Sequence, residues 1–547
     1  MVDVKSLISQ LTLEEKAALC TGSGPWHTEA VERLGIPKIT MSDGPHGVRK
    51  VQNLEESGHT KSFPATCFPP AVALASTWNT ELIQKVGEYL GDECISLDVD
   101  ILLGPGVNIK RTPLCGRNFE YFSEDPYLAG KIGAAFVKGV QSKGVGTSLK
   151  HFTANNQEYQ RFTINAEIDE RTLREIYLPA FENTVKESQP WTVMCAYNKI
   201  NGIFASEHYQ LLTRILKSEW NFEGFVVSDW GAVHNRVTAL KGGLDLQMPG
   251  SNDLDVQRVI NAVKNKELDE TVLNQAVERI LRIIFQAKET KKGHIKFNKV
   301  KHHEFARKVS TESIVLLKNE DNILPIKNVD SISLIGLMAK EPRFQGGGSS
   351  LINPTKVDDS FQEIKELIGD SISLKYAEGY SNDGVDKTLI DEACEVAKHS
   401  NIAILFSGLP FEYEIEGNDR KTLDLPESHI ELIKAVAHAN PKTIVVLSNG
   451  SPISMHQWIN DVPAVVEAYL LGQTGGGAIV DILFGKVNPS GKLAETFPER
   501  LEHNPAHLNY PGEVGRVRYG EGLYVGYRYY DKKKIDPLFP FGYGLSY

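Results

Sequence analysis

The chain has 547 residues, of which 41% are hydrophobic and 24% charged, with a formal net charge of −11 and a pI near 5.8. This length predicts roughly two or three domains, because a single hydrophobic core stops growing well below it. The acidic balance argues against nucleic-acid binding, which needs a basic face. No stretch reaches the about 18 apolar residues that predict a membrane span.

The cysteines are scattered along the chain without close pairs. They are Cys20, Cys67, Cys94, Cys115, Cys195 and Cys394. This spacing is typical of free thiols in a reducing compartment and not of a zinc site or a disulfide framework. The first residues, MVDVKSLISQLTLEEK, carry acids early and lack the apolar run of a secretory signal. We therefore expect a cytoplasmic protein.

Over the first 290 residues, short apolar runs alternate with segments of helical period. The runs are KITMSD, DVDILLGPG, VGTSLKH, WTVMCAYN and GFVVSDW. Between the last three, apolar residues repeat with a helical period, from Leu173 to Val185 and again from Leu211 to Leu216. This alternation predicts an α/β domain over residues 1–290, with a (β/α)8 TIM-like barrel as the expected form.

Polar residues stand where these apolar runs end. They are Asp43, Lys150 with His151, Tyr197 with Asn198, and Asp229. A single strand-ending Asp is about as often a helix N-cap, and a lone Lys-His pair is more often found on the surface. Barrel enzymes, however, gather their active sites at the C-terminal ends of the strands. We therefore expect these residues to share one rim and to form a pocket for a polyhydroxylated ligand.

A charged stretch of low apolar content runs from Lys288 to Lys308. It predicts a linker over residues 291–308, in which the pair His302–His303 is solvated. Beyond it the alternation restarts with SISLIGLMA, NIAILFSGLP, KTIVVLSNG and AVVEAYLLG, and with a helix predicted over residues 387–399. Continuous apolar strands indicate a mostly parallel sheet covered on both faces. Residues 309–547 are therefore expected to form a second α/β domain.

An acidic segment, FEYEIEGNDRKTLDLPE, follows the run NIAILFSG and contains Glu412, Glu414 and Glu416. An isolated acidic run is usually a solvated loop. This one leaves the C-terminal edge of the second predicted sheet, which is the edge where open α/β sheets bind ligands. From there it could supply a second carboxylate to Asp229, and two carboxylates in different surroundings are the minimum for glycoside hydrolysis.

Two glycine-rich segments resemble phosphate-binding loops only superficially. They are RFQGGGSSLINP over residues 343–354 and GQTGGGAIVDILFG over residues 472–485. Both lack the Lys of the phosphate loop, so we predict tight turns, the first of them near a ligand. The sequence contains neither H-E-x-x-H nor C-x-x-C, and we predict no metal and no cofactor.

Several motifs together resemble family 3 glycoside hydrolases, in particular the intracellular bacterial β-glucosidases. They are SDGPHGVR, GRNFEYFSEDPYLAG, KHFTANNQEYQR, VMCAYN, GFVVSDWGAVH, EGNDRKTLDLP, NPSGKLAETFP and FPFGYGLSY, and they cover essentially the whole chain. The resemblance implies a (β/α)8-like domain followed by an α/β/α sandwich, with the active site between them. Many relatives continue past FPFGYGLSY into a fibronectin-III-like third domain, which we expect to be absent here.

The resemblance also implies roles for single residues. Asp229 matches the catalytic nucleophile and Glu416 the general acid/base, with Glu414 and Glu412 as alternatives because this loop varies in the family. The general acid needs a raised pKa, and the two carboxyl groups are expected roughly 5–5.5 Å apart. The residues expected to bind the sugar are Asp43, Arg49, Arg117, Lys150, His151, Arg161, Met194, Tyr197, Trp230 and Ser349.

The expected activity is retaining, exo-acting hydrolysis of terminal β-D-glucosyl residues, with a β-glucoside or β-gluco-oligosaccharide as partner and a homodimer as a further expectation. A β-xylosidase or α-L-arabinofuranosidase of the same family is the alternative, and a catalytically impaired sugar-binding fragment is another. The family's N-acetylglucosaminidases are disfavoured, because KHFTANNQEYQR stands where they carry KHFPGHG.

Overall fold

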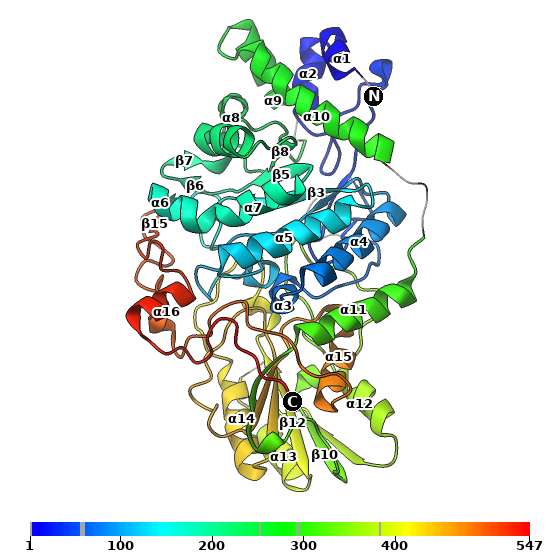
Figure 1. The fold of residues 1–547 in the computed structure, drawn as a ribbon, viewed down its shortest axis with the longest axis vertical. Coiled ribbons are helices and arrows are strands. Elements are labelled where there is room, and N and C mark those ends of the chain that lie inside the picture. The colour runs from blue at the N-terminus through cyan, green and yellow to red at the C-terminus, as the bar shows by residue number, and fades with distance from the viewer. Residues whose placement is uncertain (1–2, 55–60, 251–252, 291–292, 294–295, 382–383) are drawn as a thin grey trace.

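The computed structural model describes residues 3–54, 61–250, 253–290, 293, 296–381 and 384–547. A barrel domain and a sandwich domain lie one above the other, and the C-terminal segment reaches the side of the barrel before the chain ends at the sandwich (Figure 1).

The barrel is built on five parallel strands in the order β1-β2-β3-β5-β8. Single bridges continue the ring, from Val227 to Leu246, from Gln247 to Thr21 and from His27 to Thr40 beside β1. The predicted TIM-like barrel is thereby confirmed. The strand bounds are β1 (Met41–Asp43), β2 (Ile101–Leu103), β3 (Gly146–Phe152), β5 (Thr192–Cys195) and β8 (Phe225–Ser228).

Helices surround the barrel because their apolar faces fit its outer surface. Both predicted helical stripes lie in helical segments, although residues Leu173–Tyr177 and Gln210–Glu219 are π-helical. Helices α4 and α5 pack against each other at glycines: a Cβ on Gly139 would lie 2.0 Å from Gln84 O. The helices are α1 (Val4–Gln10), α2 (Leu13–Leu19), α3 (Ala71–Ser76), α4 (Thr80–Ser96), α5 (Pro126–Gln141), α6 (Glu170–Thr172), α7 (Pro179–Ser188), α8 (Arg236–Gly242), α9 (Asp253–Lys264) and α10 (Glu270–Thr290).

The sandwich contains a six-stranded sheet in the order β11-β10-β12-β13-β14-β9, in which only the edge strand β9 is antiparallel. Every residue of β12 and β13 is buried, as expected for central strands covered on both faces. The strands are β9 (Val315–Asn319), β10 (Ser331–Ile335), β11 (Ser373–Ala377), β12 (Ile402–Gly408), β13 (Thr443–Ser448) and β14 (Ala464–Glu467). The helices are α11 (Lys299–Ser313), α12 (Ser360–Ile368), α13 (Lys387–Lys398), α14 (Glu427–Ala439) and α15 (Gly475–Leu483).

The predicted linker differs from the structure over much of its length. Of residues 291–308, 291–292 and 294–295 lie outside the described residues, and the part from Lys299 onward belongs to α11. The expectation of solvated histidines is wrong for His302, which is buried with Nδ1 2.6 Å from Glu93 Oε1. The physical reason is that α11 packs against α3 of the barrel and α15 of the sandwich, contacts that the local sequence does not reveal.

The second glycine-rich segment is a helix and not a tight turn. Helix α15 begins at Gly475 within it. A Cβ on Gly476 would lie 2.5 Å from Asp358 O, and one on Gly477 would lie 2.3 Å from Arg307 Nη1. These glycines therefore serve close packing, which overrides their poor helix propensity.

The C-terminal segment returns to the barrel. Strand β15 (Arg516–Arg518) pairs in parallel with β4 (Asn165–Glu167) in a small sheet that also holds β6 (Lys199–Ile200) and β7 (Ile203–Phe204). Helix α16 (Tyr527–Lys533) begins where Tyr527 N donates to Glu124 Oε1 at 2.8 Å. The last part of the predicted second domain thus ties the two domains together.

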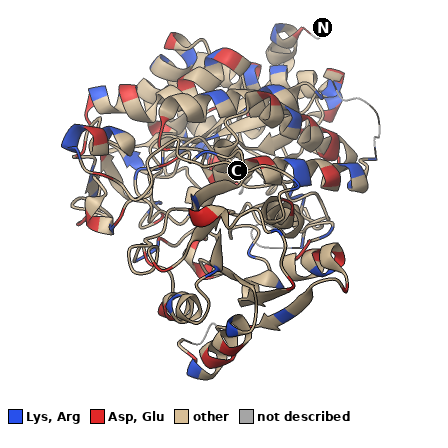
Figure 2. Ribbon diagram, turned by 60° about the horizontal axis from the view of Figure 1, so that its bottom comes forward, with Lys and Arg blue, Asp and Glu red and all other residues tan. Residues whose placement is uncertain are grey.

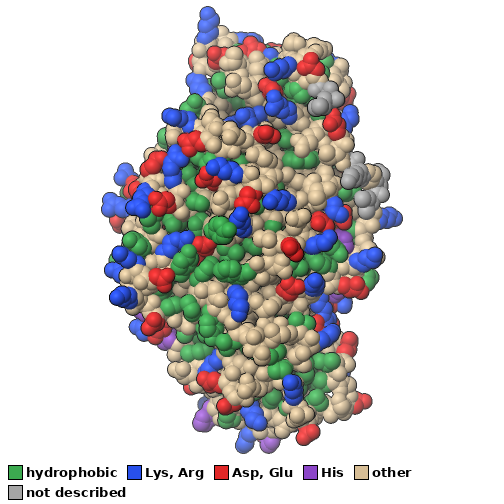
Figure 3. All heavy atoms as spheres, in the orientation of Figure 1, with side chains coloured by type: hydrophobic (Ala, Val, Ile, Leu, Met, Phe, Trp, Pro, Cys, Tyr) green, Lys and Arg blue, Asp and Glu red, His purple; other side chains and the backbone are tan. Residues whose placement is uncertain are grey.

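Charged side chains of both signs are interspersed over the helices and the visible surface, with apolar side chains between them (Figures 2 and 3). None of the helices in the described part of the chain has the length and apolar content of a membrane span.

Candidate active site

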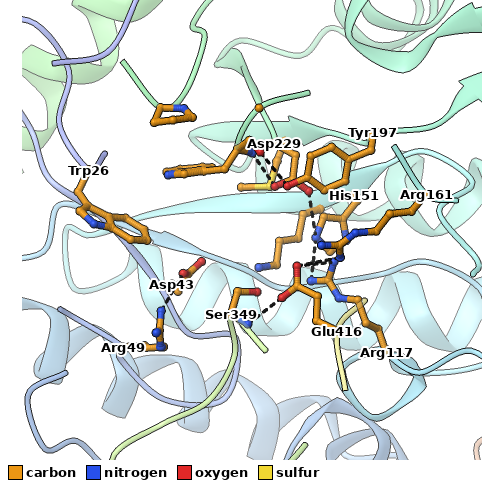
Figure 4. Close-up of a pocket in the computed structure, with 15 residues that line it drawn as sticks. Trp26, Asp43, Arg49, Arg117, His151, Arg161, Tyr197, Asp229, Ser349 and Glu416 are labelled. Atoms are coloured by element: carbon orange, nitrogen blue, oxygen red, sulfur yellow. Dashed lines mark hydrogen bonds and ion pairs between the residues drawn. The ribbon is translucent and has the colours of Figure 1, made fainter. Parts of the chain in front are cut away.

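A cavity of about 370 Å³ lies between the C-terminal ends of the barrel strands and loops from the sandwich (Figure 4). Its walls combine carboxylates, cations and aromatic rings. The lining residues are Trp26, Asp43, Arg49, Arg117, Lys150, His151, Arg161, Met194, Tyr197, Asp229, Trp230, Gly231, Pro249, Ser349 and Glu416.

Asp229 follows the fully buried strand β8 directly and is itself 8% exposed. Its Oδ1 accepts a hydrogen bond from Trp230 N at 2.8 Å, while Oδ2 is buried without a hydrogen-bond partner among the described residues. Burial raises the pKa of this carboxyl group, and the nearby Arg117 only partly opposes the effect. The result is a carboxylate oxygen on a rigid strand with a free lone pair beside the cavity.

His151, at the end of β3, is a neutral hydrogen-bonding group. Burial lowers its pKa well below the ordinary value, with Arg117 and Lys150 acting in the same direction. Its Nε2 lies 3.1 Å from Arg117 Nη2, which can only donate, so the ring proton belongs on Nδ1, 3.2 Å from Tyr121 OH. The 3.7 Å contact between His151 Nε2 and Asp229 Oδ2 is therefore not an ion pair.

Glu416 reaches the cavity on the loop that follows β12, as predicted. Its Oε2 accepts from Ser349 N at 2.7 Å and its Oε1 from Arg161 Nη1 at 2.8 Å, with Arg117 Nη1 3.6 Å away. The neighbouring Gly348 has φ +114°, and a Cβ there would lie 2.3 Å from Glu416 Cβ. The glycine-rich segment thus has to be glycine at this point for the carboxylate to fit.

The pKa of Glu416 differs from the expected raised value. Burial alone would raise it, but Arg117, Arg161 and the Ser349 N–H outweigh burial and hold the pKa well below its usual range. Without substrate, Glu416 is therefore ionised. For Glu416 to act as an acid, the positive potential of Arg117 and Arg161 must be offset so that the pKa of Glu416 rises.

Asp43 and Arg49 form the opposite wall of the cavity. Asp43 Oδ2 lies 3.4 Å from Arg49 Nη1, and both residues are buried. Burial raises the pKa of Asp43 to about 6, against the lowering effects of Lys150 and Arg49. A carboxylate and two cations so placed can accept from and donate to sugar hydroxyls.

Aromatic rings form the remaining wall. Tyr197 OH donates to Trp230 O at 3.0 Å, and Trp230 Nε1 donates to Pro25 O at 2.9 Å. The rings of Trp26 and Trp230 are 5.5 Å apart between centroids. Apolar ring faces beside polar groups suit the C–H faces of a sugar.

Apart from Asn198 and the two alternatives to Glu416, every residue predicted for the site from the sequence lines this cavity. Asn198 is buried beside it and donates to Thr153 O at 3.4 Å and to Lys199 O at 3.2 Å. Of the two alternatives to Glu416, Glu412 is exposed, and Glu414 is buried behind the loop, where it accepts from Gly450 N at 2.7 Å. Sequence reasoning missed Trp26, Gly231 and Pro249. Trp26 stands in a Gly- and Pro-containing loop without periodicity, and nothing in its surroundings signals a site.

Comparison with known proteins gives the class of this site. The model of the glycosyl hydrolase family 3 N-terminal domain matches residues 28–283, and that of the family 3 C-terminal domain matches residues 314–547. The chain therefore belongs to glycoside hydrolase family 3.

Named relatives cover the whole chain. It is 58% identical to thermostable β-glucosidase B of Acetivibrio thermocellus, over 100% of this chain and 73% of that protein. It is 47% identical to an exo-α-(1→6)-L-arabinopyranosidase of Bifidobacterium longum, over 99% and 72% of the two chains. The solved β-glucosidase 3B of Thermotoga neapolitana in complex with glucose has a TM-score of 0.91 and 36% identity, over 100% and 83%.

Proposed function

We propose that this chain is a retaining, exo-acting β-glucosidase that hydrolyses terminal non-reducing β-D-glucosyl residues of oligosaccharides or glucosides. The observation that carries the proposal is a pair of largely buried carboxyl groups, Asp229 and Glu416, lining one cavity in opposite electrostatic surroundings. The volume of this cavity, about 370 Å³, lies at the small end of the range of about 300–1,000 Å³ that is typical of ligand pockets. This size supports binding of a single terminal sugar.

In the first step, Asp229 Oδ2 attacks the anomeric carbon and the bond to the leaving oxygen breaks. Its electron pair stays on that oxygen, which takes a proton from Glu416. In the second step, Glu416 accepts a proton from water, the water oxygen bonds to the anomeric carbon, and the ester to Asp229 breaks. Two inversions leave glucose in the β-configuration.

The remaining lining residues are proposed to bind the sugar. Asp43, Arg49, Lys150 and neutral His151 supply donors and acceptors for hydroxyl groups, and Trp230 supplies an apolar face. The relatives named for β-glucosidase activity and the glucose complex of the Thermotoga neapolitana enzyme support glucose as the sugar. The Bifidobacterium longum relative makes α-L-arabinopyranosides the second candidate substrate.

The test is an NMR time course with 4-nitrophenyl β-D-glucoside, which should show β-glucose as the first product. First-formed α-glucose would contradict retention. A parallel panel of 4-nitrophenyl β-xyloside, α-L-arabinofuranoside and α-L-arabinopyranoside ranks the sugars by kcat/KM. An inert chain that still binds glucose would instead support an impaired sugar-binding protein.

We also propose that the protein is cytoplasmic and forms a homodimer. All six cysteines are free, which supports the reducing cytoplasm. Cell fractionation tests the compartment, and size-exclusion chromatography with light scattering tests the homodimer.

A further inference from the structure

A second buried glutamate, Glu158, lies directly behind Glu416, and the mechanism above does not use it. Its side chain is fully buried. One oxygen, Oε2, accepts from Gly417 N at 2.8 Å and from Arg161 Nη1 at 2.7 Å. The other, Oε1, is buried without a hydrogen-bond partner in the described part of the chain.

Arg161 connects the two glutamates through a single nitrogen. Its Nη1 lies 2.7 Å from Glu158 Oε2 and 2.8 Å from Glu416 Oε1. One positive charge is thus shared by two carboxyl groups. The charge of Glu158 therefore decides how much of the positive potential of Arg161 acts on Glu416.

Glu158 also holds the main chain that carries Glu416. Glu416 N donates to Gly347 O at 3.1 Å, so the bond from Gly417 N to Glu158 fixes the peptide on the other side. In return, the Asp419 carboxylate of the same loop accepts from Glu158 N at 2.9 Å and from Tyr159 N at 2.8 Å. The barrel segment and the sandwich loop thus bind each other by crossed carboxylate-to-amide bonds.

We infer that Glu158 is a positioning residue for the acid/base: it anchors the peptide after Glu416 and offsets the charge of Arg161. The inference rests on the proposed function, because it assigns Glu416 the proton transfer. Without the charge of Glu158, Arg117 and Arg161 would hold the pKa of Glu416 lower still.

The electrostatic surroundings of Glu158 support this role. Burial raises its pKa to about 7, although Arg117 and Arg161 lower it. When Glu158 ionises as the pH rises through about 7, its negative charge raises the pKa of Glu416. The titratable and charged groups that face it are Arg117, Arg161, Glu416, Asp419, Cys115, Tyr121 and Tyr510.

The experiment compares two substrates in Glu158→Gln, which keeps the acceptor oxygen and the volume but removes the charge. Cellobiose needs a proton on its leaving oxygen, whereas 2,4-dinitrophenyl β-glucoside does not. If the pKa of Glu416 falls by one unit, kcat/KM for cellobiose falls about tenfold at pH 7, while that for the dinitrophenyl glucoside stays within about twofold. Glu158→Asp restores the charge and should bring the ratio of the two kcat/KM values back toward that of the parent.

Glu124→Gln is the matched control, because burial raises the pKa of Glu124 to about 7 as well and its carboxylate binds Thr496 and Tyr527, outside the cavity. It should leave the ratio unchanged. An unchanged ratio in Glu158→Gln, or an equal loss on both substrates, overturns the inference while β-glucosidase activity of the parent stands. If the parent prefers α-L-arabinopyranosides, the glucose assignment alone fails and the same ratio is measured with that sugar.

Discussion

The two carboxylates of the site come from regions built in different ways. Asp229 ends a core strand whose residues are all buried, and its position follows from the strand itself. Glu416 lies on a loop whose position depends on Gly348, Arg161 and Glu158, residues from both domains. One carboxylate is thus held by local structure and the other by contacts between domains. Five predictions, beginning with the largest expected effect, test this difference and the role of Asp43 on the opposite wall of the cavity.

Replacing Asp229 by Ala should remove the proposed nucleophile without disturbing the loop that carries Glu416. We expect kcat on 4-nitrophenyl β-glucoside to fall by about 10⁴-fold or more. Added azide should restore release and form α-glucosyl azide, because it attacks from the face that Asp229 occupies. Asp169→Ala, which removes the cap of a surface helix, is the control. More than a tenth of the parent activity in Asp229→Ala would contradict the assignment.

Replacing Glu416 by Ala should slow only the steps that move a proton. On cellobiose, kcat/KM should fall about 10²- to 10⁴-fold, with little change on 2,4-dinitrophenyl β-glucoside. Azide should then yield β-glucosyl azide from the glucosyl-enzyme. The exposed Glu412→Ala variant should behave like the parent. If Glu412→Ala shows the leaving-group effect instead, the acid/base has been misassigned.

The pH dependence of activity should reveal the ionisation of Asp43, which lies on the wall of the cavity opposite Glu416. Since the pKa of Asp43 is raised to about 6, this carboxylate takes up a proton as the pH falls through 6. With 2,4-dinitrophenyl β-glucoside, which needs no proton from Glu416, we expect kcat/KM to fall about tenfold per pH unit below that point. A pH profile of initial rates checks this, and activity that is flat down to pH 4 would contradict a role for ionised Asp43.

The same shift makes a prediction for stability. The folded state holds the Asp43 proton more tightly than the unfolded chain, so this group's stabilisation is complete below about pH 4 and is lost as the pH rises through about 6. Asp43→Asn should therefore unfold at higher denaturant than the parent at pH 7, with the difference shrinking toward pH 4. Urea melts at both pH values measure this.

The smallest change concerns the loop support. Gly348→Ala meets both a positive φ and the Glu416 side chain, so it should cost about 1–3 kcal/mol of unfolding free energy and displace the acid/base. Gly384 has φ +106° with open space around its Cβ position. Gly384→Ala should thus show a comparable backbone cost without the loss of activity on cellobiose. Equal activity in the two variants would contradict the support assigned to Gly348.

Much of the site could be predicted from the residues at the ends of the apolar runs in the sequence. Asp43, His151 and Asp229 stand where apolar runs stop, and parallel strands of a barrel must present these ends at one rim. The same rule applied to the second sheet pointed to the acidic segment with Glu412, Glu414 and Glu416, and the family resemblance selected Glu416 among them. Trp26 and Glu158 lie in irregular segments, where no period or boundary marks a side chain as part of a site.

Packing between distant segments explains the errors. His302 lies in a charged stretch whose composition predicts exposure to solvent, yet the packing of α11 buries it against Glu93. The glycines at residues 475–477 predict a turn, but they lie in α15, where the close approach of Asp358 and Arg307 leaves no room for a Cβ at Gly476 and Gly477. Glu93 is far from His302 in the sequence, and Asp358 and Arg307 are far from residues 475–477.

The sequence alone determined the two α/β regions, the strand-end carboxylate and the acidic loop, because alternation, burial pattern and boundary residues are local properties of the chain. The tertiary structure decided the charge state of that loop's Glu416. Its pKa depends on Arg117, Arg161 and Ser349, which come together only when the two domains close over the cavity. The strength of an electrostatic interaction depends on distance in space and not on separation along the chain. The charge state of Glu416 therefore depends on the folded arrangement.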